Sequence, residues 1–472
     1  MKEKMSTLTA ADSETGTGGV LVKGSKEKVF SRVSIDTRTV RAGDVFFAIR
    51  GPNQDGHRFI AEALSKGAAG IVAERNYEHP DEFPADRVLI KVDDTHDALK
   101  KLARWMRNRW HGILVAVTGS MGKTTTREFA CNIMRSKFSV YRTPGNYNNL
   151  FGLPLALFGL GSEYDLGIFE MGMSAPGEIE EMCRIATPSV GIITNVAPVH
   201  LQFFSSLEQI ARAKGELAAA LPPDGTLIYN ADDPLVNNIA ADFPGRKVSF
   251  GFSDSADVRA DNVKILSLDE TTFRISWRGI SSDAKIALAG VHYVMNALAG
   301  AALGASFGIT LPRIVQSIGM LENASMRGQV IRFAQGFVVI DDSYNSNPNA
   351  LVQMIDVLSK VPLFKRRIVI AGEMLELGSS SGAFHYECGR IAAARGVDVL
   401  VGIQGASSEI VRGFDESGGS GAKGYFFPAA EDALDLIRSE VREGDLVLVK
   451  GSRGVRLEKV ISDLGRQYEV LK

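Results

Sequence analysis

The stretch ILVAVTGSMGKTTT, residues 113–126, decides the fold of this chain. It opens with an apolar run of strand length, turns through Gly119 and Gly122 to Lys123, and enters a helix-like segment at 127–135. A buried parallel strand that feeds a tight loop and a helix is the layout of a phosphate-binding loop. Backbone N–H groups and the positive end of the helix dipole would face the phosphates. Lys123 adds a point charge, and the Thr124 hydroxyl can bind magnesium.

The loop departs from the common phosphate-loop pattern G-x-x-x-x-G-K-[ST], because Val117 stands where the first glycine belongs. The shorter pattern Gly119-x-x-Gly122-Lys123-Thr124 remains. The alternative is an ordinary strand–turn–helix that happens to contain Gly-Lys-Thr. Strand, loop, lysine and hydroxyls are all in register, which favours the phosphate loop.

Length and composition limit the number of domains and the class of protein. At 472 residues the chain is too long for one core, and we expect about three domains. An apolar content of 45% and a charged content of 23% are typical of a soluble globular protein. The net charge of −2 gives no electrostatic footprint for nucleic acid.

Cysteines and apolar runs point to the cell compartment. Cys131, Cys183 and Cys388 fit no metal or disulfide spacing and are expected to be small core residues in a reducing compartment. No apolar run reaches the roughly 18 residues of a membrane span. Residues 1–19 lack the apolar centre of a secretory signal. We expect a cytoplasmic protein without a membrane span.

The pattern predicts an α/β protein of three domains. Residues 1–108 form a small mixed α/β domain, and 97–110 is an amphipathic helix that packs the linker onto the central domain. Residues 109–324 form a doubly wound, mostly parallel sheet with the phosphate loop. Residues 325–472 form a Rossmann-like α/β domain.

The expected elements are as follows. Central strands are expected at 114–117, 167–170, 190–194 and 226–229, with an antiparallel extension at 258–288. The last domain is expected to have strands at 337–340, 368–371, 397–401 and 446–449, and helices at 349–360, 384–395 and 429–442. A further helix is expected at 59–66, and the glycine-rich 413–424 as a flexible surface loop.

Polar groups follow the central strands at the edge where open α/β sheets bind ligands. Glu170 ends one strand, Thr194 and Asn195 end the next, and His200 follows within a short loop. With Thr124 they could surround a metal-bound nucleotide. Magnesium prefers oxygen, so Thr124 and Glu170 are natural ligands and His200 a less usual one. The alternative for His200 is a hydrogen-bonded loop residue.

Two other features are ambiguous on the residues alone. Ser34, Asp36, Thr37 and Arg38 gather short polar groups around one cation. Such a cluster suits a phosphate or a sugar, but it is at least as often a capped turn. Lys214 has the surroundings of an ordinary helix-surface lysine.

The run DDSYNSNP, residues 341–348, ends the first strand of the last domain, and Arg327 precedes that strand. Its carboxylates could take a pair of ribose hydroxyls, and Arg327 could reach a phosphate. The alternative is a strand end with a capping turn before the next helix.

With these residues in view, the sequence resembles the Mur ligases, the ATP-dependent amide-forming enzymes of peptidoglycan precursor synthesis. The resemblance covers essentially the whole chain. The short loop 118–125 looks like that family's phosphate loop, which would explain the missing first glycine. The other matching motifs are GNYNN at 145–149 with GLP at 152–154, Glu170, TNV at 194–196 with His200, KGE at 214–216, NADDP at 230–234, and His292 with Asn296.

Within the family the chain looks most like the branch that joins D-alanyl-D-alanine to UDP-N-acetylmuramoyl-tripeptide. The signs are 341–348, GEMLELG at 372–378 with His385, and VKGSR at 449–453. The Asp-Asn-Pro-Arg motif of the enzyme that adds the third residue does not occur. Glu373 stands where aspartate is expected in many relatives, which keeps the carboxylate.

The resemblance implies a set of roles. Lys123, His200 and Lys214 would be catalytic. Thr124 and Glu170 would bind one magnesium. His200 would bind a second magnesium together with Lys214, which would be a carbamate. Lys214 follows His200 by about four helical turns at 3.6 residues per turn. ATP would be bound by Gly119, Ser120, Met121, Gly122, Lys123, Thr124, Thr125, Asn296, Arg327 and Asp342. The substrates would be bound by Ser34, Asp36, Thr37, Arg38, Asn146 and Asn345, where 36–38 resembles the family's uridine-nucleotide-binding segment.

We expect an acyl-phosphate intermediate, because a carboxylate is a poor electrophile and needs activation, and we expect a monomer. Two other functions stay open. One is a sister ligase with another acceptor, such as the third-residue Mur ligase or a folate polyglutamate ligase, although the latter lacks a comparable N-terminal domain. The other is a nucleotide-dependent switch without ligation chemistry.

Overall fold

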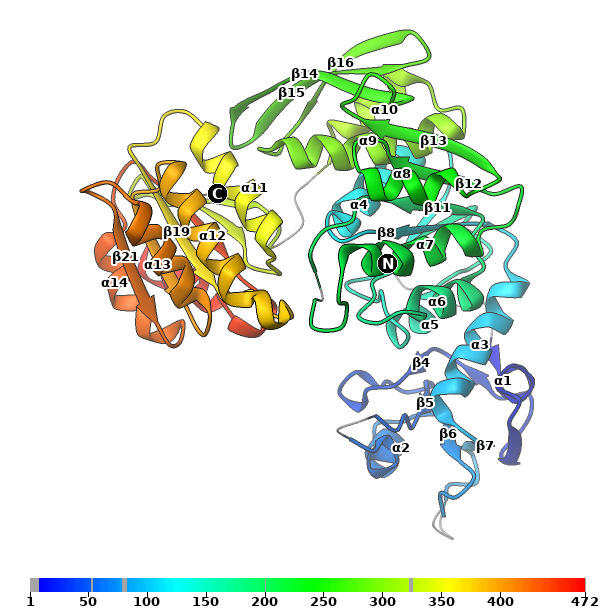
Figure 1. Cartoon of the computed structure of the whole chain (residues 1–472). Coiled ribbons are helices and arrows are strands. Elements are labelled where there is room, and N and C mark those ends of the chain that lie inside the picture. Colours follow the sequence, from blue (N-terminus) through cyan, green and yellow to red (C-terminus); the bar gives the residue numbers. More distant parts are fainter. Residues whose placement is uncertain (1–7, 52–53, 79–82, 200, 322–325, 472) are drawn as a thin grey trace.

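The computed structural model describes residues 8–51, 54–78, 83–199, 201–321 and 326–471. Figure 1 shows three bodies in chain order, with the N-terminal domain below the central domain and the C-terminal domain beside it. Each body is built on a sheet that is mostly parallel, as the sequence predicts. Within the described residues, no helix combines the length and apolar character that crossing a membrane requires.

The N-terminal domain has a five-stranded sheet in the order β2-β7-β6-β5-β4. Only the β2–β7 pair is antiparallel. The strands are β2 (Val20–Lys23), β4 (Val33–Ser34), β5 (Val45–Phe47), β6 (Gly70–Glu74) and β7 (Val88–Val92), with β1 (Leu8–Thr9) paired to β3 (Val29–Phe30). The helices are α1 (Ala10–Thr17) and α2 (Ile60–Ser65), the latter a shorter form of the predicted 59–66.

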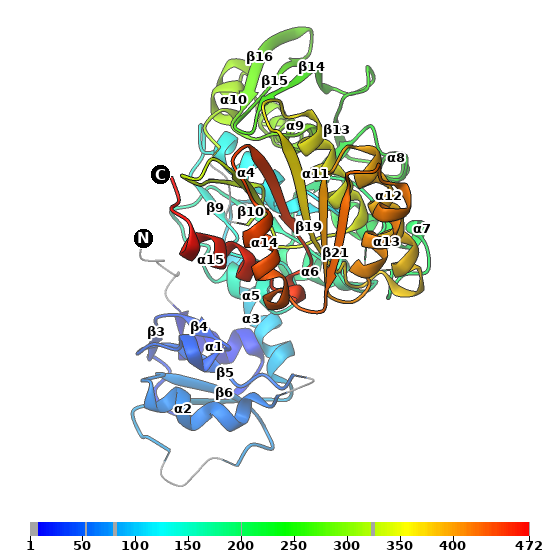
Figure 2. The same ribbon diagram turned by 90° about the vertical axis from the view of Figure 1, so that its left-hand side faces the viewer.

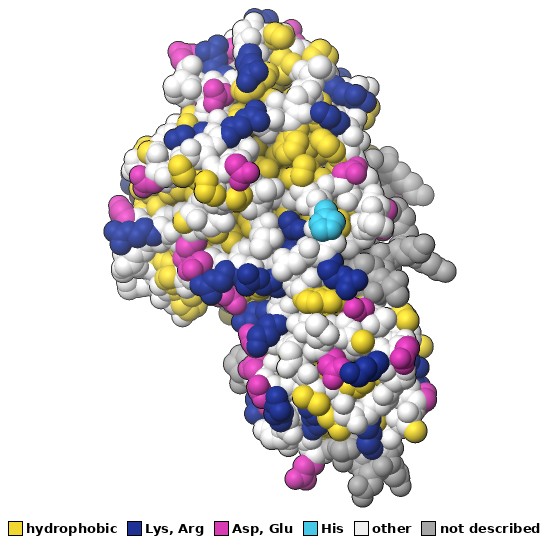
Figure 3. All heavy atoms as spheres, turned by 90° about the vertical axis from the view of Figure 1, so that its right-hand side faces the viewer, with side chains coloured by type: hydrophobic (Ala, Val, Ile, Leu, Met, Phe, Trp, Pro, Cys, Tyr) yellow, Lys and Arg dark blue, Asp and Glu magenta, His cyan; other side chains and the backbone are white. Residues whose placement is uncertain are grey.

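Helix α3 (Thr95–Arg109) joins the N-terminal and central domains, and its prediction is confirmed. Its apolar stripe is buried between the two domains. Figure 3 shows Lys and Arg side chains gathered at this junction. Ion pairs join Lys100 to Glu181 and Arg109 to Asp12, both at 3.2 Å. The junction therefore combines apolar packing with charge pairing.

The central sheet has nine strands in the order β16-β15-β14-β13-β12-β11-β8-β10-β9. The sequence predicts its parallel part and its antiparallel extension, and both are confirmed. The strands are β8 (Ile113–Thr118), β9 (Val140–Arg142), β10 (Leu166–Glu170), β11 (Val190–Ile193), β12 (Thr226–Asn230), β13 (Arg246–Gly251), β14 (Val258–Ser267), β15 (Glu270–Trp277) and β16 (Ile280–Ile286). The helices are α4 (Lys123–Met134), α5 (Gly152–Leu157), α6 (Glu178–Ala186), α7 (Leu207–Ala220), α8 (Pro234–Ala241), α9 (Val291–Ser306) and α10 (Leu311–Ile318).

Strand β8 lies between β10 and β11, which follow it along the chain on opposite sides. The loops at the carboxyl ends of β8 and β11 therefore lead to opposite sides of the sheet, and such a point leaves a crevice beyond the carboxyl end of β8. The phosphate loop occupies this position. Helix α4 begins at Lys123, four residues before the predicted start, so Lys123 belongs to its first turn.

The C-terminal sheet has the order β17-β18-β22-β19-β20-β21, with only β17 antiparallel. Helices cover both faces, α11–α13 on one and α14–α15 on the other (Figure 2). The strands are β17 (Gln329–Arg332), β18 (Val338–Asp342), β19 (Arg366–Gly372), β20 (Val399–Ile403), β21 (Lys423–Phe427) and β22 (Asp445–Lys450). The helices are α11 (Pro348–Lys360), α12 (Ser381–Ala394), α13 (Ser407–Ser417), α14 (Leu434–Glu440) and α15 (Glu458–Gln467).

The predicted loop at 413–424 is shorter in the structure, because only residues 418–422 lie between α13 and β21. Gly413 lies in α13 and Gly424 in β21. A Cβ at Gly413 would lie 2.1 Å from the Tyr386 carbonyl oxygen, and one at Gly389 of α12 would lie 1.9 Å from that of Ile410. These two glycines let α12 and α13 pack closely, so glycine content here reflects helix contact and not flexibility. The predicted helix 429–442 is also shorter, because α14 covers only Leu434–Glu440.

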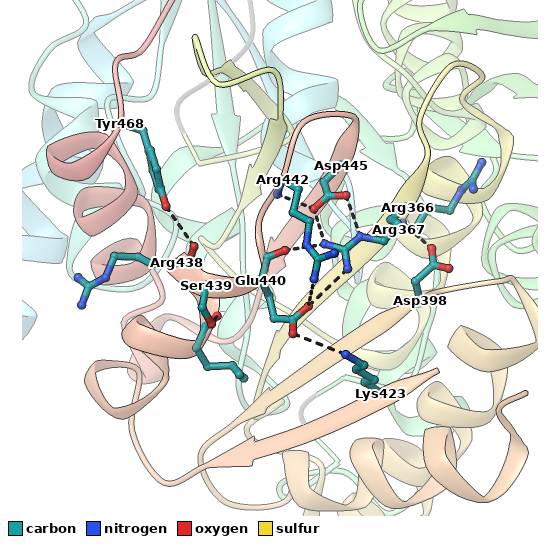
Figure 4. Close-up of polar contacts among 11 residues, drawn as sticks. Arg366, Arg367, Asp398, Lys423, Arg438, Ser439, Glu440, Arg442, Asp445 and Tyr468 are labelled. Carbon is teal, nitrogen blue, oxygen red and sulfur yellow. Dashed lines mark hydrogen bonds and ion pairs between the residues drawn. The ribbon is translucent and has the colours of Figure 1, made fainter. Parts of the chain in front are cut away.

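A polar network ties the amino ends of β19 and β22 (Figure 4). The Arg366 guanidinium donates to both carboxylate oxygens of Asp445 at 3.0 and 2.8 Å, and pairs with Glu440 at 3.4 Å. The hydrogen bonds that Arg366 donates to Asp445 raise the pKa of Arg366, which stays charged. Ligands bind at the carboxyl ends of such strands, so this network serves stability and not chemistry.

Candidate active site

The two glycines of the phosphate loop are required by its shape. Gly119 has φ +147° and Gly122 has φ +78°. A Cβ at Gly119 would lie 1.8 Å from Thr194 Oγ1, and one at Gly122 would lie 2.3 Å from Asn296 Oδ1. Any larger residue would push the loop away from β11 and α9. The spacing Gly-x-x-Gly therefore follows from two close neighbours on other elements.

The end of β11 holds the loop in place. The Ser120 N–H donates to the Asn195 carbonyl and the Met121 N–H to Asn195 Oδ1, both at 2.9 Å. Thr194 Oγ1 donates to the Met121 carbonyl at 2.6 Å. The N–H groups of the first turn of α4, from Lys123 on, have no partner inside the helix because of helix geometry. These N–H groups and the helix dipole are suited to bind an anion.

Lys123 bends back over the loop, and its Nζ donates to the Gly119 carbonyl at 2.8 Å. Burial lowers the pKa of Lys123, while the Glu170 carboxylate works in the opposite direction and Arg327 adds to the lowering. An incoming phosphate would supply the negative charge that favours the ammonium form.

Thr124 and Glu170 lie together, as the sequence predicts for a magnesium site. Thr124 Oγ1 donates to Glu170 Oε2 at 2.7 Å, and Asn148 Nδ2 donates to Glu170 Oε1 at 2.8 Å. Burial alone would raise the pKa of the Glu170 carboxyl, but Lys123, Arg127 and these hydrogen bonds lower it overall. An ionised carboxylate beside a hydroxyl is a donor set that suits Mg²⁺, which usually takes one or two carboxylates plus substrate phosphates.

No group of three or more His, Cys, Asp or Glu side chains that could hold a metal occurs among the described residues. A magnesium site built on Thr124, Glu170 and nucleotide oxygens needs no such group. His200, predicted for a second magnesium, lies outside the described residues.

Lys214 is not the surface lysine that its neighbours in the sequence suggest, because it is only 2% exposed. It lies on α7, and no hydrogen bond or ion pair joins it to another described residue. Burial, with Lys123 nearby, holds the pKa of Lys214 well below its usual range. The helical spacing expected from His200 is wrong, because α7 begins only at Leu207 with Ser206 as its N-cap.

A cavity of about 1260 Å³ joins the phosphate loop to the C-terminal domain. It brings together most of the predicted site residues from segments far apart in the sequence. Those that line it are Ser120, Met121, Gly122, Lys123, Thr124, Thr125, Asn146, Glu170, Asn296, Arg327, Asp342 and Asn345.

Comparisons with known proteins cover nearly the whole chain. The model of the Mur ligase family, catalytic domain, matches residues 29–106, that of the Mur ligase middle domain matches 117–304, and that of the Mur ligase, glutamate ligase domain, matches 326–453. The UDP-N-acetylmuramoyl-tripeptide–D-alanyl-D-alanine ligase of Escherichia coli (strain K12) is 34% identical over 92% of this chain and 93% of that protein. The chain belongs to the Mur ligase family.

Other relatives are also similar to this Mur ligase along nearly its whole length. The ligase of the same name from Bacillus subtilis (strain 168) is 32% identical over 94% of this chain and 96% of that protein. A crystal structure of MurF from Acinetobacter baumannii aligns with a TM-score of 0.87 at 29% identity, over 98% of this chain and all of that one. MurF ligase from Thermotoga maritima in complex with ADP aligns with a TM-score of 0.81 at 29% identity, over 92% and 97%.

The C-terminal side of the cavity in this Mur ligase is built at the carboxyl ends of β18 and β22. Asp342 and Lys450 are register partners there, and Lys450 Nζ donates to Asp342 Oδ2 at 2.6 Å and to the Asn345 carbonyl at 2.9 Å. The Arg327 guanidinium lies 4.2 Å from the Tyr344 ring centre. Lys450 is not among the site residues predicted from the sequence, although its place at the end of a predicted strand is a usable signal.

The buried His385 fixes a loop of the C-terminal domain. His385 Nε2 accepts from the Met374 N–H at 2.9 Å, and Nδ1–H donates to the Ser381 carbonyl at 2.7 Å. Burial lowers the pKa of His385, which stays neutral. Burial also lowers the pKa of His292, at the start of α9, to about 4. His385 thus fixes the loop that follows β19 and is not a proton carrier.

The predicted substrate cluster of the N-terminal domain forms a capped turn. Asp36 Oδ1 accepts from the Arg38 N–H at 3.0 Å, and the Arg38 side chain pairs with the same carboxylate at 2.6 Å. Ser34 and Thr37 are buried. In the described part of the chain, these four residues do not line the cavity, nor do Gly119 and Lys214. Their binding of a substrate stays a prediction.

Proposed function

We propose that this Mur ligase joins D-alanyl-D-alanine to UDP-N-acetylmuramoyl-tripeptide and converts ATP to ADP and phosphate. The observation that carries the proposal is the cavity between the phosphate loop and the C-terminal domain, in a chain that matches ligases of this name along most of its length. The relative crystallised with ADP supports nucleotide use by the same fold.

In the proposal, ATP lies across the domain boundary. Its β- and γ-phosphates contact Lys123 and the first-turn N–H groups of α4. Asn296, Arg327 and Asp342 contact the rest of the nucleotide from α9 and the C-terminal domain. Thr124 and Glu170 hold one Mg²⁺, which would offset the repulsion between the phosphates and an incoming carboxylate.

The chemistry follows from the poor reactivity of a carboxylate. The terminal carboxylate of the tripeptide attacks the γ-phosphorus in line, a P–O bond to ADP breaks, and an acyl phosphate forms. The neutral amine of D-alanyl-D-alanine then attacks the acyl carbon. Phosphate leaves as the C–N bond forms, and the amine releases its proton. Lys123 and the fixed N–H groups stabilise the charge that develops on the transferred phosphoryl group.

Lys214 is proposed to act as a carbamate, and with His200 to hold a second Mg²⁺. Its burial supports the idea, because a lowered pKa leaves the neutral amine that adds to carbon dioxide with loss of a proton. The carbamate would replace a cation by an anion with two oxygens, which magnesium prefers.

The remaining assignments are proposals of the same kind. Residues 1–108 bind the uridine nucleotide through Ser34, Asp36, Thr37 and Arg38. Residues 109–324 bind ATP, and 325–472 deliver the dipeptide, with Asn146 and Asn345 at the peptide substrates. The enzyme is proposed to be a cytoplasmic monomer, since ATP is available there and the three cysteines are free thiols.

The test is phosphate release from ATP in the presence of nucleotide tripeptide, with and without D-alanyl-D-alanine. The proposal expects release to depend on both peptide substrates and the ligated product to appear. A nucleotide switch would ignore the dipeptide. A sister ligase would respond instead to a free amino acid, and a folate ligase to glutamate and a folate, so a panel of acceptors separates these alternatives.

A further inference from the structure

Arg127 is a buried cation next to the phosphate loop. It lies on α4, one helical turn after Lys123, and is only 4% exposed. A buried guanidinium is costly unless carboxylates and carbonyls surround it. Its partners therefore show what the charge is used for.

The Arg127 guanidinium contacts three groups. Nη2 donates to Glu128 Oε1 at 2.7 Å, which pairs it with its own chain neighbour. Nη1 donates to the Gly145 carbonyl at 3.3 Å and lies 3.7 Å from Glu170 Oε2. One nitrogen thus faces both the proposed magnesium ligand and the start of the loop 145–149.

The same loop returns to Glu170 from its other side. Asn148 Nδ2 donates to Glu170 Oε1, and the Asn148 carbonyl accepts from the Gly172 N–H at 2.7 Å. Asn146 of this loop lines the cavity. Arg127 therefore connects α4, the carboxylate at the end of β10, and the loop that would meet the substrate.

Binding of Mg²⁺ between Thr124 and Glu170 separates the roles of the partners of Glu170. The Thr124 hydroxyl, which donates to Glu170 Oε2, would also offer its oxygen to the cation. Arg127 and Asn148 Nδ2, in contrast, contact the carboxylate without offering a metal ligand, so they can only orient it. Groups that orient a metal ligand in this way commonly change metal affinity by about 10–100-fold when removed.

We propose that Arg127 is a positioning residue, which holds Glu170 in place for magnesium and couples the metal site to the loop 145–149. The inference rests on the proposed function for its magnesium site. It predicts that Arg127 matters for metal binding more than for nucleotide binding, because Lys123 and the N–H groups of α4 do not depend on its contacts.

The experiment uses the full chain with Arg127→Met, which keeps the unbranched stem and removes the charge, and with Arg127→Lys, which keeps the charge and removes the planar fork. Arg142→Met is the matched control, because Arg142 also pairs with Glu128 but is half exposed and, in the described structure, forms no ion pair or hydrogen bond with Glu170. Mn²⁺ binding in the presence of a non-hydrolysable ATP analogue is measured by electron paramagnetic resonance. Binding of the metal-free analogue is measured by calorimetry, and unfolding temperature by scanning calorimetry.

Arg127→Met is expected to weaken Mn²⁺ binding at least tenfold and metal-free nucleotide binding by less than twofold, with Arg127→Lys between it and the parent. Arg142→Met should bind Mn²⁺ like the parent. Equal Mn²⁺ binding by Arg127→Met and Arg142→Met overturns the proposal, even if the unfolding temperature falls. If Arg127→Met does not fold, the test rests on Arg127→Lys. The proposal is then overturned if Arg127→Lys binds Mn²⁺ within twofold of the parent. The Mn²⁺ and nucleotide binding measurements need no peptide substrate, so their outcome does not depend on which acceptor the enzyme ligates.

Discussion

Replacing Leu268 by alanine should loosen the C-terminal domain from the central one. Leu268 lies in the turn between β14 and β15, in the antiparallel extension of the central sheet. It is only 4% exposed and lies in the apolar cluster of the C-terminal domain with Leu351 and Met354. Figure 1 shows the hairpin reaching toward α11. Asp269 next to it pairs with Arg332 of β17.

The magnitude follows from the burial. Truncating a leucine removes three carbons, and about 0.8 kcal/mol per buried carbon gives about 2.4 kcal/mol before any cavity remains. Buried Leu→Ala changes cost about 2–5 kcal/mol, and a site between two domains can partly close. We expect a loss of about 2–3 kcal/mol, which weakens the docking of the domains more than the fold of either. Leu266 is 48% exposed, and its alanine variant should change stability by less than about 0.5 kcal/mol.

Two measurements check this. Denaturant unfolding of both variants gives the free-energy change, and small-angle X-ray scattering gives the separation of the domains. Leu268→Ala should also raise the KM for ATP, because Asn296 and Arg327 contact the nucleotide from opposite sides of the boundary in the proposal. If Leu268→Ala matches Leu266→Ala in stability and scattering, the hairpin does not anchor the C-terminal domain.

Four further predictions follow from the site. Lys123→Ala should abolish ligation with an unchanged unfolding temperature, since a loop-end lysine contributes little to stability; ligation near the parent rate would refute the phosphate-loop assignment. Asp36→Ala or Arg38→Ala should raise KM for the uridine nucleotide more than for ATP, because they would bind a remote part of the substrate, and equal effects would indicate a structural role. Lys214→Ala should lose most activity but keep ATP binding, and depletion of carbon dioxide and bicarbonate should slow the parent; an active variant together with a bare Lys214 ammonium at good resolution would exclude the carbamate. Burial lowers the pKa of His385, so its stabilising effect is present above the ordinary histidine pKa of about 6.5 and is lost as pH falls through the folded value; the unfolding temperature should drop more steeply from pH 7 to 5 in the parent than in His385→Gln, and parallel slopes would contradict this.

The sequence by itself determined the phosphate loop and where several main strands lie along the chain. The loop is local: strand, two glycines, lysine and hydroxyl lie within 113–126, so their relation is set by backbone geometry over a few residues. Glu170 could also be placed, because the carboxyl ends of neighbouring parallel strands share an edge. Apolar periodicity located several other strands of the central and C-terminal domains and α3, but it missed β9, β13, β17 and β21.

Only the tertiary structure decided the burial of charge and the contacts between distant segments. Lys214 has the pattern of a surface lysine, yet neighbouring segments cover it. Arg127 gave no signal in the sequence, since its partners Gly145 and Glu170 come from other loops and strands. Gly413 suggested a loop, but the nearby carbonyl of Tyr386 makes it a helix contact. Local patterns record hydrogen bonding and amphipathic faces along the chain, whereas the environment of a buried charge depends on which segments the fold brings beside it.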